Sequence, residues 1–373
     1  MHDPESRNWR EASFATLADY ANGRAFKPED WGKKGLPIIR IAQITNPGSA
    51  TDFYDGEVEP RHRIENGDLI FSWSATLAVM RWERGPAVLN QHLFKVTPVE
   101  GIDRRWLQYR LEASIPDLAD EAHGTTMKHI RKGTLASKTT LVPPLDEQRR
   151  IAEVLRSVDE AIAAAQAAAA QAHHVLGGHL SLIMERGLAL HEEYGPGGLP
   201  NGWSEGRCDD YFVLQRGFDI TESQAVAGPF HVISSSGPSY SHSEAAVAGP
   251  AVITGRKGRL GTVFFSPDPC WPHDTTLWVK DFKGNHPRFV YWKLREMKLN
   301  AYDAATSVPT LNRNNVHALL IRFPPLEEQR EIAEILDAQE DTVARAEATI
   351  EALVRTKAVL ADDLLSGRVR VPA

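Results

Sequence analysis

Residues 143–155 read PPLDEQRRIAEVL, and residues 324–336, which begin 181 positions later, read PPLEEQREIAEIL. Ten of the thirteen positions are identical, and two of the three differences keep the character of the side chain. Each copy follows a segment of similar size and precedes a long stretch with helical periodicity. The repeat predicts two copies of one module, each a variable part followed by a helix.

Apolar or small residues follow each Pro-Pro pair at alternating spacings of four and three. They are Ile151, Leu155, Val158, Ile162, Ala165, Ala169, Ala172 and Leu176 in the first copy, and Ile332, Leu336, Gln339, Val343, Ala346, Ile350, Leu353, Lys357, Leu360 and Leu364 in the second. This spacing is typical of a coiled-coil seam, which Gln339 and Lys357 interrupt. Because an internal repeat implies a two-fold relation, we expect the two helices to pair in antiparallel fashion.

The segments outside these helices contain short β-branched and aromatic runs separated by glycine and proline. Strands are predicted within residues 36–44, 67–73, 247–255 and 261–265, and helices within residues 104–113 and 288–299. The predicted fold class is α+β, with two mixed α/β domains separated and joined by two long helices. The expected boundaries are a first domain at 1–142, a helical region at 143–190, a second domain at 191–323 and a helical region at 324–373.

Composition places the chain among ordinary globular proteins, with 42% hydrophobic and 24% charged residues. The N-terminal stretch MHDPESRNWR does not resemble a signal peptide, and no run of about 18 apolar residues predicts a membrane span. Cys208 and Cys270 have no partner at metal-ligand spacing, so we expect buried, inert thiols and a reducing cytoplasm.

The net charge of −7 lies entirely on the two helical regions, while both domains are neutral. Within the domains the cations cluster, because residues 123–145 hold four Lys or Arg and residues 245–267 hold three, with no Asp or Glu in either segment. An acidic protein can therefore still offer local surfaces that bind an anion.

No motif for catalysis stands out. The sequence has no GxGxxG or GxxxxGK[ST] phosphate-binding loop and no [ND]PP[YF] sequence of amino-methyltransferases. The fourteen histidines are scattered, and His173-His174 is expected on a helix surface without a carboxylate set. We expect neither a catalytic centre nor a metal site on this chain.

Polar and basic loops are the remaining candidates for function. Residues 255–261 (GRKGRLG) form a basic loop between two predicted strands, which is either an exposed hairpin turn or a contact to phosphates or guanine edges. Residues 306–314 align at the 181 offset with residues 125–133, so equivalent loops precede both helices. The residues predicted to make such contacts to phosphates or base edges are Lys27, Lys33, Lys34, Trp73, Ser74, Lys128, His129, Arg131, Lys132, Arg216, Ser234, Ser235, Ser236, Arg256, Lys257, Arg259, Thr306, Ser307, Asn312, Arg313 and Asn314.

The chain resembles the specificity (S) subunits of type I restriction-modification enzymes. The two PPL[DE]EQ segments resemble that family's helical signature, and NGRAFKPEDWGKKGLPIIRIAQI (22–44) resembles the start of its target recognition domain. Six further segments resemble motifs of the second such domain: LPNGW (199–203), RG (216–217), ISSSGP (233–238), GRKGRLGTVFF (255–265), WPHDTTLWV (271–279) and ATSVPTLNRNNV (305–316). Residues 125–130 (TTMKHI) depart from the pattern seen at 306–312.

The resemblance implies a DNA-binding subunit without an active site or cofactor of its own. Each target recognition domain would read one half of a bipartite, asymmetric site in double-stranded DNA, and the coiled coil would fix the spacer. Two modification subunits would methylate adenine N6 with S-adenosylmethionine, and restriction subunits would add ATP- and Mg-dependent translocation and cleavage in phage defence.

Three other interpretations stay open. The chain could serve a methylation-only system, which a pull-down of a restriction subunit would separate from a complete one. It could be a coiled-coil scaffold without DNA readout, which a DNA-binding assay of the assembled complex would decide. The weakest alternative is an enzyme in its own right, which methyl transfer by the purified chain alone would support.

Overall fold

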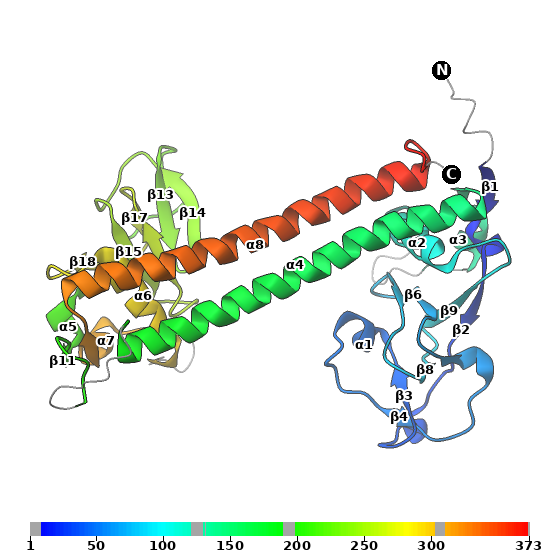
Figure 1. The fold of residues 1–373 in the computed structure, drawn as a ribbon, viewed down its shortest axis with the longest axis horizontal. Coiled ribbons are helices and arrows are strands. Elements are labelled where there is room, and N and C mark those ends of the chain that lie inside the picture. The colour runs from blue at the N-terminus through cyan, green and yellow to red at the C-terminus, as the bar shows by residue number, and fades with distance from the viewer. Residues whose placement is uncertain (1–8, 121–129, 131, 189–197, 303–309, 372–373) are drawn as a thin grey trace. The chain divides into compact units, whose positions relative to one another are not determined.

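The computed structural model describes residues 9–120, 130, 132–188, 198–302 and 310–371 (Figure 1). The chain forms two compact units, of which unit 1 comprises residues 1–165 and 349–373, and unit 2 comprises residues 166–348. There are two long helices, α4 (Leu145–Arg186) and α8 (Leu326–Ser366). One part of each belongs to unit 1 and the other part to unit 2.

Unit 1 is a mixed α/β unit. Its strands are β1 (Arg10–Ser13), β2 (Ala18–Asn22), β3 (Leu36–Ile39), β4 (Phe53–Tyr54), β5 (Arg63–Ile64), β6 (Leu69–Ser72), β7 (Ala78–Arg81), β8 (Ala87–Leu89), β9 (Leu93–Pro98) and β10 (Thr139–Val142). Its shorter helices are α1 (Ile41–Thr45), α2 (Arg104–Asp120) and α3 (Lys132–Ser137), with 3-10 turns η2 (Phe14–Thr16), η3 (Pro28–Asp30) and η4 (Pro60–His62).

Unit 2 has the same kinds of element. Its strands are β11 (Ser204–Arg207), β12 (Val213–Arg216), β13 (Phe230–Ser234), β14 (Gly237–His242), β15 (Ala251–Gly255), β16 (Val263–Ser266), β17 (Trp271–Pro272), β18 (Thr276–Asp281) and β19 (Leu320–Phe323). Its shorter helices are α5 (Cys208–Tyr211), α6 (Pro287–Glu296) and α7 (Arg313–His317), with the 3-10 turn η5 (Leu299–Tyr302).

The strand order of the sheets repeats between the units. The four-stranded sheet β2-β9-β6-β7 of unit 1 corresponds to β12-β18-β15-β16 of unit 2, and the ribbon β1-β10 corresponds to β11-β19. The third sheet is β4-β3-β8-β5 in unit 1 and β14-β13-β17 in unit 2, and both contain a parallel pair, β3 with β8 and β13 with β17. The internal sequence repeat is therefore a repeat of topology.

The long helices pack into the core of each unit. In unit 1, Ile151, Leu155 and Leu364 share one hydrophobic cluster with Trp106 of α2. In unit 2, Leu176, Ile332 and Leu336 share a cluster with Phe289 and Trp292 of α6. Most of the stabilisation of these helices therefore comes from burial of an apolar face against the sheets and short helices.

Polar pairs show that α4 and α8 run antiparallel. Asp159 bonds to Lys357 at 2.6 Å in unit 1, and in unit 2 His173 meets Glu347 at 2.9 Å and His179 meets Gln339 at 2.7 Å. As the residue number rises along α4, the residue number of the partner on α8 falls. The predicted antiparallel coiled coil is confirmed, and Lys357 and Gln339, which interrupt the apolar seam, form cross-helix contacts.

A buried glutamine near the start of each helix ties it to its own unit. Gln148 is 1% exposed, donates to the carbonyls of Gly101 and Pro143 and accepts from the backbone N–H of Asp103. Gln329 is also 1% exposed and makes the corresponding bonds to Pro324, Asn285 and His286. These bonds explain why both copies of the repeat carry a glutamine at the third position after PPL.

The glutamate of each pair binds a tryptophan. Trp9 donates its indole N–H to Glu147 at 3.0 Å, and Trp203 donates to Glu328 at 2.9 Å. Arg370, which follows α8, completes the first cluster through bonds of 2.6 and 2.7 Å to the two oxygens of Glu147. Burial alone raises the pKa of Glu147, but the bonds from Arg370 and Trp9 outweigh it and hold that pKa below its ordinary value.

Replacing Glu147 with Gln should destabilise unit 1 by about 2 kcal/mol at pH 7, because Arg370 loses a nearly buried carboxylate. A carboxyl group with a depressed pKa in the folded state stabilises above its unfolded pKa, and this contribution disappears as pH falls through the folded value. The gap between wild type and variant in urea unfolding should therefore shrink from pH 7 to pH 3.5. The exposed Glu153→Gln is the control, and a gap that stays constant with pH would contradict the assignment.

The predicted strands are confirmed with one correction. Residues 41–44 are not strand, because β3 ends at Ile39 and α1 begins at Ile41. The side chain of Gln43 turns back to accept from the backbone N–H of Arg40 at 3.0 Å, which closes the first turn of this helix. Alternation of apolar residues did not reveal this local bond.

The thiol prediction is confirmed, since Cys208 and Cys270 are both free and buried. Burial raises the pKa of Cys208 to about 12 and that of Cys270 to about 11, so both thiols stay protonated. Among the described residues, no helix is both long and apolar enough to cross a membrane.

Candidate nucleic-acid interface

One end of the four-stranded sheet of unit 2 carries a cavity rich in arginine. Its volume is about 380 Å³, and its lining residues are Arg216, Arg256, Leu277, Thr310, Leu311, Asn312 and Arg313. Four segments far apart in the sequence therefore meet at one place. All the polar side chains of this set can donate hydrogen bonds to an anion or a base edge.

Strand ends and backbone bonds bring these segments together. Arg216 ends β12, and Arg256 follows directly after β15. The amides of Arg256 and Lys257 both donate to the carbonyl of Thr275, at 2.8 and 3.0 Å, and the amide of Leu311 donates to the carbonyl of Arg256 at 2.8 Å. The order of the sheet, rather than sequence proximity, thus builds the cavity.

A glycine lets β12 reach this position. A Cβ at Gly217 would lie 2.2 Å from the carbonyl oxygen of His273 and 2.5 Å from that of Pro272, too close for any side chain. Gly23 in unit 1 has the same constraint against the carbonyls of Leu89 and Asn90. The RG and NG dipeptides of the sequence therefore occupy equivalent sites.

The cations of this region differ in their charge partners. Arg216 bonds to Asp219 at 2.9 Å and to Asp274 at 3.0 Å. Within the described part of the chain, Lys257, Arg259 and Arg313 are exposed and make no ion pair. These three side chains keep their full positive charge for an external anion.

The predicted serines lie beside the basic loop, with different roles. Ser235 is 8% exposed, its amide donates to Thr275, and its carbonyl accepts from Thr262 at 2.8 Å. Ser234 uses its hydroxyl within the β13–β14 turn, donating to Gly237, while Ser236 is exposed. The structure thus places Ser235 in the wall of the loop.

Unit 1 has an equivalent surface with other chemistry. The amide of Ile130 donates to the carbonyl of Trp73 at 2.9 Å, as Leu311 does to Arg256 in unit 2. Trp73 and Ser74 therefore occupy the places of Arg256 and Lys257. The Trp73 ring stacks on Phe94, with centroids 5.6 Å apart, and Ser74 is 3% exposed, so these two positions carry an aromatic ring and a buried hydroxyl group where unit 2 has two cations.

Several predicted residues are not joined to these surfaces. Lys27 precedes η3 and pairs with Glu29 at 3.8 Å, while Lys33 and Lys34 are exposed beside β3. Asn314 is exposed on α7 and donates its amide to the side chain of Asn312 at 3.0 Å. Lys132 is the first residue of α3. Lys128, His129, Arg131, Thr306 and Ser307 lie outside the described residues.

Sequence reasoning missed Asp274 and its unit 1 counterpart Gln91. Both lie in the short connection that leads into the strand pairing with β12 or β2. The clustering of Arg and Lys in the sequence does not indicate the acid within the motif WPHDTTLWV. The available signal was the motif itself, which places a histidine, an acid and two threonines beside the arginine cavity.

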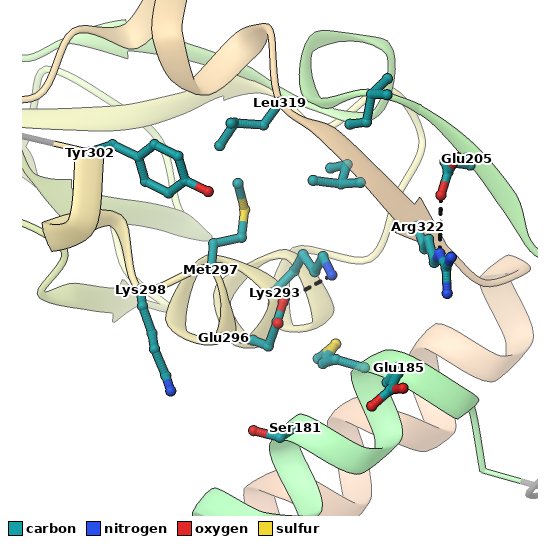
Figure 2. Close-up of a pocket in the computed structure, with 13 residues that line it drawn as sticks. Ser181, Glu185, Glu205, Lys293, Glu296, Met297, Lys298, Tyr302, Leu319 and Arg322 are labelled. Atoms are coloured by element: carbon teal, nitrogen blue, oxygen red, sulfur yellow. Dashed lines mark hydrogen bonds and ion pairs between the residues drawn. The ribbon is translucent and has the colours of Figure 1, made fainter.

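Figure 2 shows a second cavity of unit 2, of about 500 Å³, between α4, α6 and β19. Its charges are mixed and two pairs are bonded, Lys293 with Glu296 at 3.0 Å and Arg322 with Glu205 at 3.0 Å. A cavity of about 640 Å³ in unit 1 has the corresponding elements, with Arg110 on α2 in the place of Lys293. The described residues contain no group of side chains that could hold a metal ion.

Comparison with known proteins identifies the family. A model of the type I restriction modification DNA specificity domain matches residues 6–171 and 202–355. The specificity subunit of the type I restriction enzyme EcoBI from Escherichia coli is 29% identical over 158 residues, which span 42% of this chain and 32% of that protein.

Solved structures agree on the fold. The S subunit of a type I restriction-modification system from M. genitalium aligns with a TM-score of 0.63 and 14% identity over 96% of both chains. A chain from a structure on complex assembly of the type I R-M system aligns with a TM-score of 0.59 and 17% identity, over 99% of this chain and 100% of that chain. Because the family model covers most of the sequence, and the fold is shared over 96% of it, the chain belongs to the family of type I restriction-modification DNA specificity subunits.

Proposed function

We propose that this chain reads a bipartite, asymmetric site in double-stranded DNA for a type I restriction-modification complex. Residues 1–142 and 191–323 would be its target recognition domains, and residues 143–190 and 324–373 the helical regions that set the spacer. The arginine cavity of unit 2 carries the proposal, because it combines Arg256 and Arg313, which make no ion pair with a described residue, with amide and hydroxyl groups at the end of a sheet. The equivalent place in unit 1 carries different side chains, as two unlike half-sites require.

The proposed partners are two modification subunits and the restriction subunits. One chain with two equivalent surfaces fits two copies of one partner. The cavities beside α6 and α2 are such surfaces. They are lined by β19 and β10, two strands that begin and end 181 positions apart in the sequence repeat. We propose that a modification subunit docks beside each. The S-adenosylmethionine and ATP of the complex would then reside on the partners, and this chain would contribute recognition without catalysis.

The test is a methylation map. The chain is co-expressed with its neighbouring modification subunit in a host without DNA methylation, and N6-methyladenine is located by single-molecule sequencing. A split motif, with one adenine per half on opposite strands, is the expected result, together with a purified complex of two modification subunits per chain. A stable complex that neither methylates nor binds DNA would overturn DNA readout and leave the scaffold function.

Removing unpaired cations should weaken DNA binding in a salt-dependent way. Each lost phosphate contact lowers the slope of log affinity against log salt by about 0.9. Arg259→Ala and Arg313→Ala should therefore each reduce the slope by about one and weaken binding to all sequences alike. The readout is fluorescence anisotropy of the complex on duplex DNA between about 50 and 300 mM salt, where the affinity of proteins that bind phosphates changes strongly.

The matched control is Arg207→Ala. Arg207 is on β11 of the same unit and is paired with Asp209 at 2.9 Å, so its removal changes the net charge by the same amount. Its slope should stay at the wild-type value. A flat salt response of the wild type, or equal slopes for all three variants, would exclude these side chains as phosphate contacts.

A further inference from the structure

We infer that Arg216 reads a guanine, and that Asp274 positions its guanidinium for that contact. The inference rests on the proposed function and assigns separate roles to the cations of one surface. Arg216 would determine sequence, whereas Lys257, Arg259 and Arg313 would hold the phosphate backbone.

Arg216 is poorly suited to a phosphate. Its Nη2 donates to Oδ1 of Asp219 at 2.9 Å and to Oδ2 of Asp274 at 3.0 Å, so two carboxylates surround one positive charge. A phosphate that approached this guanidinium would also meet both acids. A base edge carries no formal charge, and the carboxylates do not repel it. The local charge therefore favours a base contact over a backbone contact.

The free part of the guanidinium matches a guanine. Both carboxylates bind Nη2, and no described residue accepts a hydrogen bond from Nη1 or Nε. The side chain is half exposed and lines the cavity of about 380 Å³ with Arg256 and Asn312. Both fork edges of a guanidinium include Nη2, so the contact falls to Nη1. Its two free N–H groups can donate to the O6 and N7 acceptors of one guanine in the major groove, as a lysine does from a single nitrogen.

Asp274 is itself held in place. Its side chain is only 18% exposed, so the surrounding protein limits its movement. Its carbonyl accepts from Nη1 of Arg256 at 3.3 Å, so a second arginine fixes the same segment. Asp274 can therefore restrict the rotamers of Arg216 before DNA arrives, which lowers the entropy cost of the contact.

Comparison of the two units shows that the side chain at the position of Arg216 differs, while the backbone bond of the glycine that follows it is the same. The amide of Gly217 donates to Thr276 at 3.1 Å, and that of Gly23 donates to the corresponding Leu93 at 2.9 Å. The residue before the glycine is Arg216 in unit 2 and Asn22 in unit 1. A fixed backbone that presents different side chains is what two domains with different half-sites need.

The experiment is selection from a randomised DNA duplex library by the complex of this chain with its modification subunits. The wild type should select a split motif with a guanine in the half read by unit 2. Arg216→Asn, which introduces the unit 1 residue, should lower the preference for that guanine roughly 10- to 100-fold. The other positions, the spacer and the second half-site should stay unchanged, and this also shows that the variant is folded.

Asp274→Asn separates positioning from charge. The variant removes a negative charge, so its affinity for random DNA should stay equal or rise, while its preference for the guanine falls. If Asp274 served folding alone, the variant would instead lose base preference at every position of this half-site. Arg259→Ala is the control for a phosphate contact, with lower affinity for every sequence and an unchanged motif.

Each other outcome is decisive. If Arg216→Asn behaves as Arg259→Ala does, or if the selected half contains no guanine, the inference is wrong while the proposed function stands. Blurring of the whole half-site by both variants would likewise overturn it. If the wild-type complex selects no split motif, the proposed function itself fails.

Discussion

Four residues inserted after Ala165 in α4, together with four after Ala348 in α8, are expected to lengthen the DNA spacer and leave both half-sites unchanged. Four helical residues add about 6 Å, which is close to the rise of one or two base pairs of DNA. An insertion of four keeps the apolar seam nearly in phase. The selected or methylated motif should therefore differ from the wild type in spacer length alone.

The two insertion points follow from the register of the helices. The Asp159–Lys357 pair lies in unit 1, and the His173–Glu347 and His179–Gln339 pairs lie in unit 2. Insertions at the boundary in both helices therefore leave every one of these pairs with its partner.

Insertion into α4 alone is the control. It shifts one helix by one turn against the other, so pairs on one side of the insertion separate. This variant should lose stability instead of shifting the spacer cleanly. A double insertion that altered a half-site and kept the spacer would overturn the role of the helices as a ruler.

Gln148→Leu is expected to destabilise unit 1 by roughly 3–5 kcal/mol. Leucine fills a similar volume but leaves the carbonyls of Gly101 and Pro143 and the amide of Asp103 without their partner in a buried place. Gln329→Leu should cost less, about 2–3 kcal/mol, because one of its partners is the side chain of Asn285, which can rotate to another partner.

Hydrogen exchange of the two units measures this difference. Peptides from α2 should exchange faster in Gln148→Leu, and peptides from α6 in Gln329→Leu. The exposed neighbours Arg149 and Arg330 provide the controls, since their replacement by Ala should change stability by less than about 0.5 kcal/mol. Equal protection in the glutamine variants and the arginine controls would contradict the role of these bonds.

The long helices and the repeat could be predicted because their pattern extends over many residues. Even so, Gln339 and Lys357 were interpreted as interruptions of the seam. Their partners His179 and Asp159 lie on the other helix, and only the register of the pair brings them together. A periodicity shows which face of a helix is buried, but not which polar side chains meet across it.

The candidate site could be predicted only in part for a similar reason. Clusters of Arg and Lys in the sequence indicated the loop at 255–261 and the segment at 312–314. That Arg256 occupies the position of Trp73 follows from strand pairing and cannot be seen in an alignment at the 181 offset. Asp274 was passed over because its effect depends on its distance to Arg216, which lies 58 positions away.

The cluster at Glu147 has a consequence for the way this chain can be built. Trp9, before the first strand, and Arg370, after α8, meet on Glu147, whereas at Glu328 the equivalent partners are Trp203 and Leu188, on one continuous stretch of chain. At Glu328 the peptide chain itself connects the two partners. At Glu147 a carboxylate with two bonded partners does this instead, and it ties the residue before β1 to the residues that follow α8.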